Sequence, residues 1–209
     1  FEGGVKGNFE GFSFNLAIFQ QSISGFQSNI FTGTGFVLDN AEKQSTFGVE
    51  FDTSITPVKD INFTFNMTYL KPKFDRFTRG STFVSDFSVV QLDLSGVRPS
   101  GIPEFSIAVG ANFKHQFNDN LKGYFHIDYN LDSPVQIALG LPQYRSQNQS
   151  LNSTVTLGVG HGVELSVWGR NIANSQFLTA IFPSVAQTGS LLGYPSQPRT
   201  FGVAARFRY

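Results

Sequence analysis

"RTFGVAARFRY", residues 199–209, ends the chain with two chemically different faces. Alternate residues, beginning at the first phenylalanine, are apolar or aromatic: Phe201, Val203, Ala205, Phe207 and Tyr209. The residues between them are small or cationic: Gly202, Ala204, Arg206 and Arg208. Because successive side chains of a strand point to opposite sides, this alternation predicts a β-strand with water on one side and an apolar medium on the other.

The composition of the whole chain is typical of a β-protein and argues against several partners. The 209 residues carry 15 Lys and Arg against 15 Asp and Glu, and this zero net charge predicts no nucleic-acid partner. Cysteine is absent, which leaves no disulfide and no thiolate metal site. Phe (24 residues) and Gly (21) are abundant, whereas strong helix formers are sparse. The sequence has no run of about 18 apolar residues, so we expect no transmembrane helix.

The same alternation predicts about nine strands. They span residues 2–9, 12–30, 36–56, 60–71, 104–117, 121–132, 150–160, 163–171 and 200–209. Tight turns follow the first, third, fifth and seventh strands, and long segments follow the fourth, sixth and eighth, with a short connection near residues 32–35 as the exception. All tight turns therefore lie at one end of the predicted sheet. No repeat of fixed period is present, which disfavours a propeller or a solenoid.

Two architectures use strands of this kind, a soluble β-sandwich and a transmembrane β-barrel. Several predicted strands have about ten or more residues, which is the length that crosses a bilayer when tilted. Their polar faces are mainly uncharged, and aromatic residues lie near the strand ends, as at the two surfaces of a membrane. These features favour an all-β, antiparallel transmembrane β-barrel. The alternative is a soluble β-sandwich adhesin or carbohydrate-binding module.

The strand count bears on how much of a barrel the chain represents. Single-chain bacterial barrels have an even number of strands, whereas nine is odd. The first residues, "FEGGVKGNFEG" (1–11), show no signal-peptide pattern and already look like a strand. We therefore expect residues 1–209 to be the C-terminal part of a larger barrel, with periplasmic tight turns and extracellular long loops.

Motifs near the end of the chain resemble those of TonB-dependent outer-membrane receptors. That family shows a Gly-x-Asn-Leu-like turn after the penultimate strand and a Pro-Arg-x-aromatic-Gly entry into a terminal aromatic strand. The matching residues are Gly169, Asn171, Ile172, Pro198, Arg199, Phe201, Gly202 and Tyr209. A weaker similarity lies upstream, at Asn40, Ala41, Gly48, Val49 and Glu50.

The resemblance implies a plugged barrel of the 22-stranded class in the outer membrane of a Gram-negative bacterium. Such a receptor takes up a scarce solute of the siderophore, haem, cobalamin or saccharide class, energised by the TonB complex. Its partners would be the lipid bilayer, its own plug domain, the TonB complex and a small-molecule solute. The plug domain, the TonB-contacting box and the N-terminal strands are expected upstream of this chain.

If the chain belongs to an outer-membrane receptor of this kind, three groups of residues are candidates for function. The terminal strand resembles the C-terminal signal for outer-membrane insertion, through Phe201, Val203, Phe207 and Tyr209. Lumen-facing candidates for contact with plug or solute are Lys122, Asp128, Arg170, Arg206 and Arg208. Extracellular-loop candidates for an anionic or aromatic ligand are Lys73, Phe74, Arg76, Phe77 and Arg79. For this last group we favour the simpler interpretation of a solvated hairpin stem with an aromatic girdle.

The sequence gives no pattern for catalysis or for a metal or cofactor. His115, His126 and His161 fall on different strands or turns, so no metal site is expected. Glu50 and Asp52 share one face of a strand, but a hydrated lumen wall explains them without a catalytic role. No nucleophile elbow of the G-x-S-x-G kind is present. We therefore expect no enzyme and no cofactor.

Overall fold

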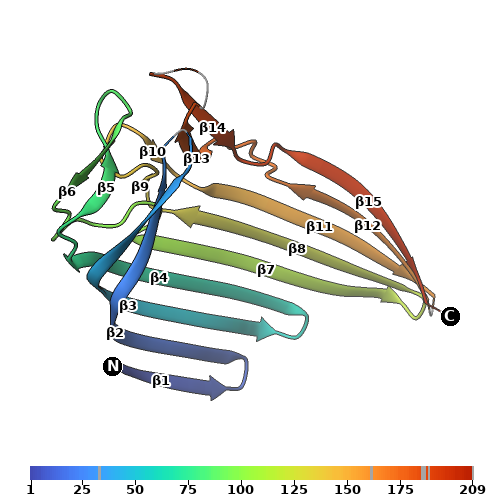
Figure 1. Ribbon diagram of the computed structural model, residues 1–209. Coiled ribbons are helices and arrows are strands. Elements are labelled where there is room, and N and C mark those ends of the chain that lie inside the picture. The colour runs from blue at the N-terminus through green and yellow to red at the C-terminus, as the bar shows by residue number, and fades with distance from the viewer. Residues whose placement is uncertain (33, 161, 185–186, 188, 209) are drawn as a thin grey trace.

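The computed structural model describes residues 1–209 except 33, 161, 185–186, 188 and 209, and consists of one large antiparallel sheet with three small ribbons (Figure 1). Nine strands form the large sheet in chain order, each paired with the next. They are β1 (Glu2–Phe9), β2 (Phe12–Phe31), β3 (Phe36–Val58), β4 (Ile61–Arg76), β7 (Phe105–Asn118), β8 (Leu121–Asp132), β11 (Gln149–Val159), β12 (Val163–Arg170) and β15 (Thr200–Phe207). The nine predicted strands are thus confirmed.

The three ribbons lie within the long connections and were missed from the sequence. They pair β5 (Gly80–Phe83) with β6 (Val89–Leu92), β9 (Val135–Gln136) with β10 (Arg145–Ser146), and β13 (Leu178–Pro183) with β14 (Leu191–Pro195). The expected end of the fourth strand at residue 71 was also wrong, because β4 continues to Arg76 and pairs there with β3. The long connections are therefore partly ordered β-structure.

The short connection near residues 32–35 lies at the same end as the long loops. Its flanking strands β2 and β3 have 20 and 23 residues and project beyond their neighbours (Figure 1). At the tip, the amide of Thr32 donates to the carbonyl of Gly35 at 2.9 Å. A projecting hairpin here takes the place of a loop, which explains the exception in the pattern of connections.

Tight turns close the opposite end of the sheet, as predicted. Gly11, between β1 and β2, has a φ of 71°, and Asp60, between β3 and β4, has a φ of 75°. Both values lie in the left-handed region, which glycine occupies freely and aspartate tolerates. These residues reverse the chain within two or three positions.

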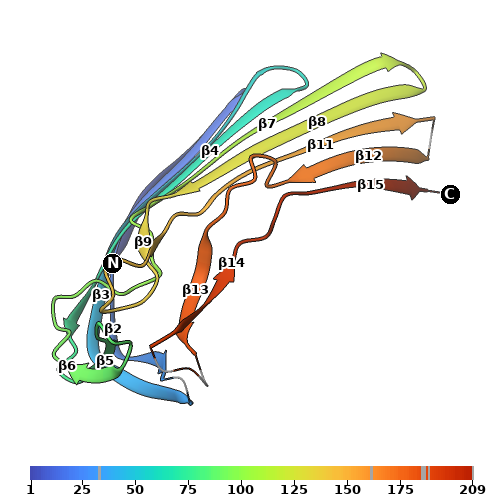
Figure 2. The same ribbon diagram turned by 90° about the horizontal axis from the view of Figure 1, so that it is seen from above.

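The large sheet is curved and leaves one of its faces without a covering layer. Figure 2 shows this curvature, with β13 and β14 on the concave side. On the other face, Val155, Val167 and Val203 lie in one row across β11, β12 and β15, and all three are exposed. Aromatic pairs flank this apolar face, with Phe9 and Phe12 near the tight turns and Tyr69 and Phe105 near the long loops. Exposed apolar surface bounded by aromatic residues is typical of a lipid-facing barrel wall.

The best-buried apolar residues lie among the long connections and in the parts of β3 and β4 beside them. One cluster comprises Ala41, Phe74, Phe77 and Leu94, and the other comprises Phe83, Ala138, Leu141 and Ile181. The second joins β5, β13 and the β9–β10 connection. We call the two clusters together the loop core. It shows that the connections pack on one another and on the neighbouring ends of β3 and β4.

Hydrogen bonds also fix the turn between β5 and β6, outside the sheet. The hydroxyl and the amide of Ser88 donate to one carboxylate oxygen of Asp86 at 2.6 and 3.0 Å. These bonds, the hydroxyl first, lower the pKa of Asp86 below its usual value because they favour the ionised form.

The β-sandwich alternative finds no support in this architecture. Within the described part of the chain, every sheet other than the nine-stranded one has only two strands, and a sandwich needs a second large sheet. Over those same residues, no helix is long and apolar enough to cross a membrane.

Candidate functional site

The polar side chains of neighbouring strands are in register on the concave face of the sheet. Backbone pairing aligns Asn62 of β4 with Asn112 of β7, and Asn112 with His126 of β8. It also aligns Asp128 of β8 with Asn152 of β11. Because side chains alternate along a strand, residues paired in this way share one face. The polar face is therefore continuous across the sheet.

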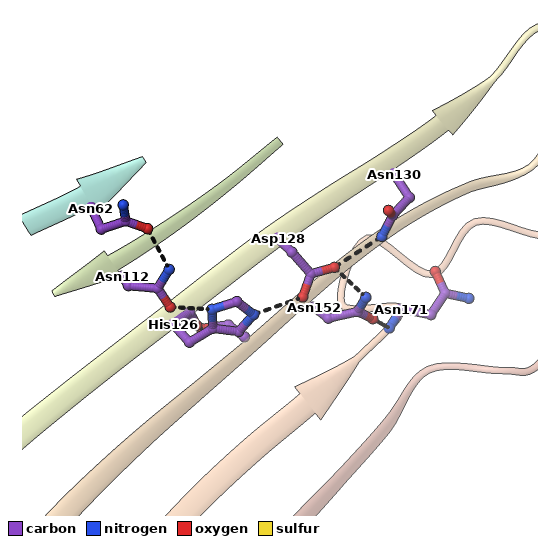
Figure 3. Close-up of polar contacts among 8 residues, drawn as sticks. Asn62, Asn112, His126, Asp128, Asn130, Asn152 and Asn171 are labelled. Atoms are coloured by element: carbon purple, nitrogen blue, oxygen red, sulfur yellow. Dashed lines mark hydrogen bonds and ion pairs between the residues drawn. The ribbon is translucent and has the colours of Figure 1, made fainter. Parts of the chain in front are cut away.

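These side chains form a chain of hydrogen bonds that we call the asparagine ladder (Figure 3). Its members are Asn62, Asn112, His126, Asp128, Asn130, Asn152 and Asn171. Asn112 donates to Asn62 at 3.3 Å, and its own oxygen lies 2.8 Å from Nδ1 of His126. Nε2 of His126 lies 3.2 Å from Asp128. The ladder thus connects β4 to β8.

Asp128 is the centre of the ladder. The amide groups of Asn130 and Asn152 donate to its Oδ2 at 2.9 and 2.8 Å, while Oδ1 faces His126. Neutral amide donors therefore hold this carboxylate from two strands. Its partners fix its orientation on the wall.

Asn171 ends the ladder and holds the last long connection in place. Its amide group donates to the carbonyls of Ser175 and Gln197, both at 2.9 Å, and its oxygen accepts from the amide of Ser175 at 2.9 Å. Its own backbone amide donates to Asn152 at 3.0 Å. One buried side chain thereby ties the start of the connection to its end.

A recess of about 740 Å³ opens beside the ladder, and we call it the ladder recess. His126, Asp128 and Arg170 line it from the strands, while Thr179 and Gln197 line it from the last connection. Trp168 lies at its wall, with the guanidinium of Arg170 5.6 Å from the ring centroid. A volume of this size is ordinary for a small-molecule site, which spans roughly 300–1,000 Å³.

The structure divides the lumen-facing candidates between two places on the polar face. Asp128 and Arg170 both line the ladder recess. Arg206 and Arg208 lie at the tight-turn end, where they approach Glu164 at 3.5 and 3.6 Å. Lys122 lies at that end too, opposite Gln116 of β7. Two of the five predicted residues therefore belong to one site.

The terminal-strand candidates lie on the apolar face. Phe201, Val203 and Phe207 are 64%, 81% and 61% exposed. Tyr209 lies outside the described residues. The ring of Phe201 covers Gly169 of β12, where a Cβ atom would come within 2.8 Å of it.

The loop candidates separate into surface cations and buried aromatic residues. Phe74 and Phe77 are only 2% and 1% exposed because they pack in the loop core, so their rings lie beneath the surface and not in the exposed aromatic girdle that we favoured. Lys73 lies 3.6 Å from Asp75, and Arg76 lies 3.9 Å from Glu42. Arg79 donates to Gln91 at 3.5 Å. Neighbouring acceptors thus already engage these three cations.

The histidines are not gathered into a metal site among the described residues. His115 packs edge-on against Phe117, with ring centroids 4.6 Å apart, and His126 belongs to the ladder. His161 lies outside the described residues.

The ladder itself was not predicted from the sequence. The available signal was asparagine recurring on one face of several strands, at Asn62, Asn112 and Asn152. Seeing that these residues meet requires the register between strands, which alternation within one strand does not give.

The comparisons with known proteins agree with this architecture. Residues 1–172 match the family described as "TonB dependent receptor-like, beta-barrel". No curated protein matches the chain significantly.

Several solved structures share the fold. The ferric yersiniabactin uptake receptor of Yersinia pestis is similar with a TM-score of 0.76 and 17% identity, over 99% of this chain and 29% of that receptor. A siderophore receptor of Acinetobacter baumannii has a TM-score of 0.71 and 15% identity, over 100% of this chain and 28% of its own. The ferric-catecholate import receptor of E. coli K12 has a TM-score of 0.65 and 14% identity, over 100% of this chain and 27% of that receptor.

The chain spans under a third of the length of each of these three receptors. At such low identity the likeness shows the fold alone, whereas the family match covers most of the chain. The family and these neighbours are transport receptors, not enzymes. The chain therefore belongs to the family of TonB-dependent receptor β-barrels, which are proteins of the Gram-negative outer membrane.

Proposed function

We propose that the chain forms part of the wall of a pore for TonB-energised uptake of a scarce solute. The solute belongs to one of four classes: siderophores, haem, cobalamin or saccharides. The observation that carries the proposal is the two-sided sheet, with exposed valines on one face and the asparagine ladder on the other. This arrangement suits a wall that has lipid outside and water inside.

Free strand edges support the proposal that residues 1–209 are the C-terminal part of a larger barrel. Among the residues that the structure describes, β1 and β15 are each paired on one side only. Unpaired backbone groups are costly in hydrocarbon, so a membrane wall requires further strands at both edges. We place these strands and the plug domain upstream of Phe1, and TonB contacts that upstream region.

The remaining candidates take roles from their positions in this barrel. The tight turns face the periplasm and the long connections face the outside. Phe201, Val203, Phe207 and Tyr209 form the insertion signal of the last strand. Lys122, Arg206 and Arg208, near the periplasmic end of the polar face, contact the plug, while Lys73, Arg76 and Arg79 remain surface candidates for an extracellular ligand.

An uptake assay in cells tests the proposed function. The gene for the full-length protein is deleted and restored, in a background with TonB and in one without it. Accumulation of labelled ferric siderophores, haem, cobalamin and oligosaccharides is then measured. We expect accumulation of one class to require both the receptor and TonB. Accumulation that is equal in all four strains for every class would refute the proposal.

A further inference from the structure

The ladder recess lies where the polar wall meets the last long connection. Its floor is the polar face of β8, β11 and β12, and residues 196–198 close one side. The side chain of Asn171 holds that connection against the wall. The recess is therefore built from fixed parts, as a binding site requires.

The charge of the lining narrows the choice of solute. The lining contains one carboxylate, Asp128, one guanidinium, Arg170, and one imidazole, His126. The carboxylate and the guanidinium balance each other, and both ring nitrogens of the imidazole are already engaged, by Asn112 and Asp128. An anionic ferric chelate or a phosphate ester is favoured by an excess of cations, which this lining does not have. A neutral solute needs no such excess.

Some polar groups of the recess are occupied by the protein, and others are available. Asp128, Asn152 and Asn171 bind one another in the ladder. Within the described residues, no hydrogen bond from the protein engages the guanidinium of Arg170 or the hydroxyl of Thr154. These groups supply donors and an acceptor, and sugar hydroxyls require both because each hydroxyl donates and accepts.

Trp168 supplies a flat apolar surface at the same place. One face of its ring lies on Gly202 of β15, where a Cβ atom would overlap the ring. The indole therefore lies against the wall of the sheet. The guanidinium of Arg170 lies over the ring, 5.6 Å from its centroid, so a sugar that stacks on the indole moves this guanidinium aside. The C–H face of a pyranose ring packs well on such an aromatic surface.

We propose that the ladder recess binds a neutral sugar, with a pyranose ring stacked on Trp168 and its hydroxyls hydrogen-bonded to Arg170 and Thr154. This proposal rests on the uptake function above and narrows its solute to the saccharide class. Amides and one balanced pair of charges surround the sugar, as suits a solute that is polar and uncharged.

The test uses the full-length protein purified from outer membranes. It is titrated with glucose, maltose, cellobiose, xylobiose and maltotriose by calorimetry and by tryptophan fluorescence. Trp168 is the one tryptophan of this chain, and subtracting the signal of a Trp168→Phe variant isolates its emission. We expect at least one of these sugars to bind and to change that emission. We expect Trp168→Ala to weaken the binding about tenfold.

Two further variants keep the test decisive. Arg170→Ala leaves the contact of the ring with Gly202 intact and is expected to weaken binding about fivefold, even if Trp168→Ala does not fold. Ser166→Ala, on the same face of β12 but outside the lining of the recess, is the matched control and should leave the affinity unchanged. If no sugar of the panel binds, or if neither recess variant weakens binding, the proposal is wrong.

The uptake assay in the same cells distinguishes failure of the proposed sugar site from failure of the proposed uptake function. TonB-dependent accumulation of a ferric siderophore by a receptor that binds no sugar would overturn the sugar site and leave the uptake function standing. Sugar binding that is weakened by the recess variants, without energised accumulation of any solute, would support the site and overturn the uptake function.

Discussion

Asn171 shows how one residue organises a long connection. It has a φ of 47°, a left-handed conformation that asparagine tolerates better than most residues. Its buried side chain makes three hydrogen bonds of 2.9 Å to Ser175 and Gln197. The family-like Gly-x-Asn motif thus has a physical basis, because the asparagine supplies both the turn and the bonds that close the connection.

We predict that Asn171→Gly loosens residues 172–199. Glycine accepts the same φ, so the variant removes the hydrogen bonds without adding backbone strain. Loss of buried bonds of this kind costs about 1–3 kcal/mol. Hydrogen exchange at the amide of Ser175 should accelerate. Asn174→Gly is the matched control, since Asn174 also has a positive φ, of 55°. Equal exchange in both variants would contradict the role given to the Asn171 side chain.

Gly169 is required by the aromatic residue that covers it. A Cβ atom there would lie 2.8 Å from the ring of Phe201 and 2.9 Å from Ile172. We predict that Gly169→Ala lowers the stability of the folded protein by about 1–3 kcal/mol through overpacking. Thermal unfolding measures the loss.

Two comparisons test this explanation of Gly169. Gly3→Ala should be tolerated, because nothing lies within 4 Å of a Cβ atom at Gly3. Adding Phe201→Leu to Gly169→Ala should restore part of the lost stability. An unimproved double variant would show that the Phe201 ring is not the cause.

At the scale of elements, alternation identified the strands of the large sheet but not the ribbons. β7 and β8 have 14 and 12 residues, long enough for a period of two to be clear. β9 and β10 have only two residues each, too few for any period. The end of β4 was misjudged because Pro72 and its charged neighbours suggest a loop, whereas pairing with β3 decides the conformation there.

The site was predictable only in part, because alternation shows which face of a strand a residue occupies but not which distant segments it contacts. Alternation assigns Asp128 and Arg170 to the polar face, and both line the recess. It cannot show that Phe74 of β4 is buried, because that burial depends on how Leu94 and Phe77 of the following connection fold back on the strand. Contacts between loops leave no periodic signal in the sequence.

The loop core makes a prediction about how the connections behave together. Leu141 is 1% exposed and packs with Phe83 and Ile181 from two other connections. Leu141→Ala should cost about 2–5 kcal/mol locally by opening a cavity. The connections should then become more sensitive to protease in intact cells. Leu192→Ala, at a position that is 52% exposed, is the control. Cleavage of the connections at equal rates in the two variants would show that the connections fold independently of one another.

At the scale of the whole molecule, the sheet is understandable only if its faces meet different solvents. A water-soluble protein of this size would cover its valines and phenylalanines with a second layer. Here the nine strands leave them exposed and direct asparagines to the concave side. The terminal strand repeats the pattern, with Val203 on one face and Arg206 paired with Glu164 on the other. A wall between lipid and a wet lumen accounts for both faces at once.

Arginine substitutions on the two faces test this explanation directly. Val167 is 58% exposed on the apolar face, and Ala204 is exposed on the polar face of the adjacent strand. If both faces met water, an arginine would be tolerated at either position. In a membrane, Val167→Arg meets hydrocarbon and should cost about 2–4 kcal/mol, whereas Ala204→Arg meets the lumen. We expect Val167→Arg alone to reduce the heat-modifiable folded form of the full-length receptor in outer-membrane fractions. Equal amounts of the two variants would mean that both faces meet water, and the barrel wall would have to be abandoned.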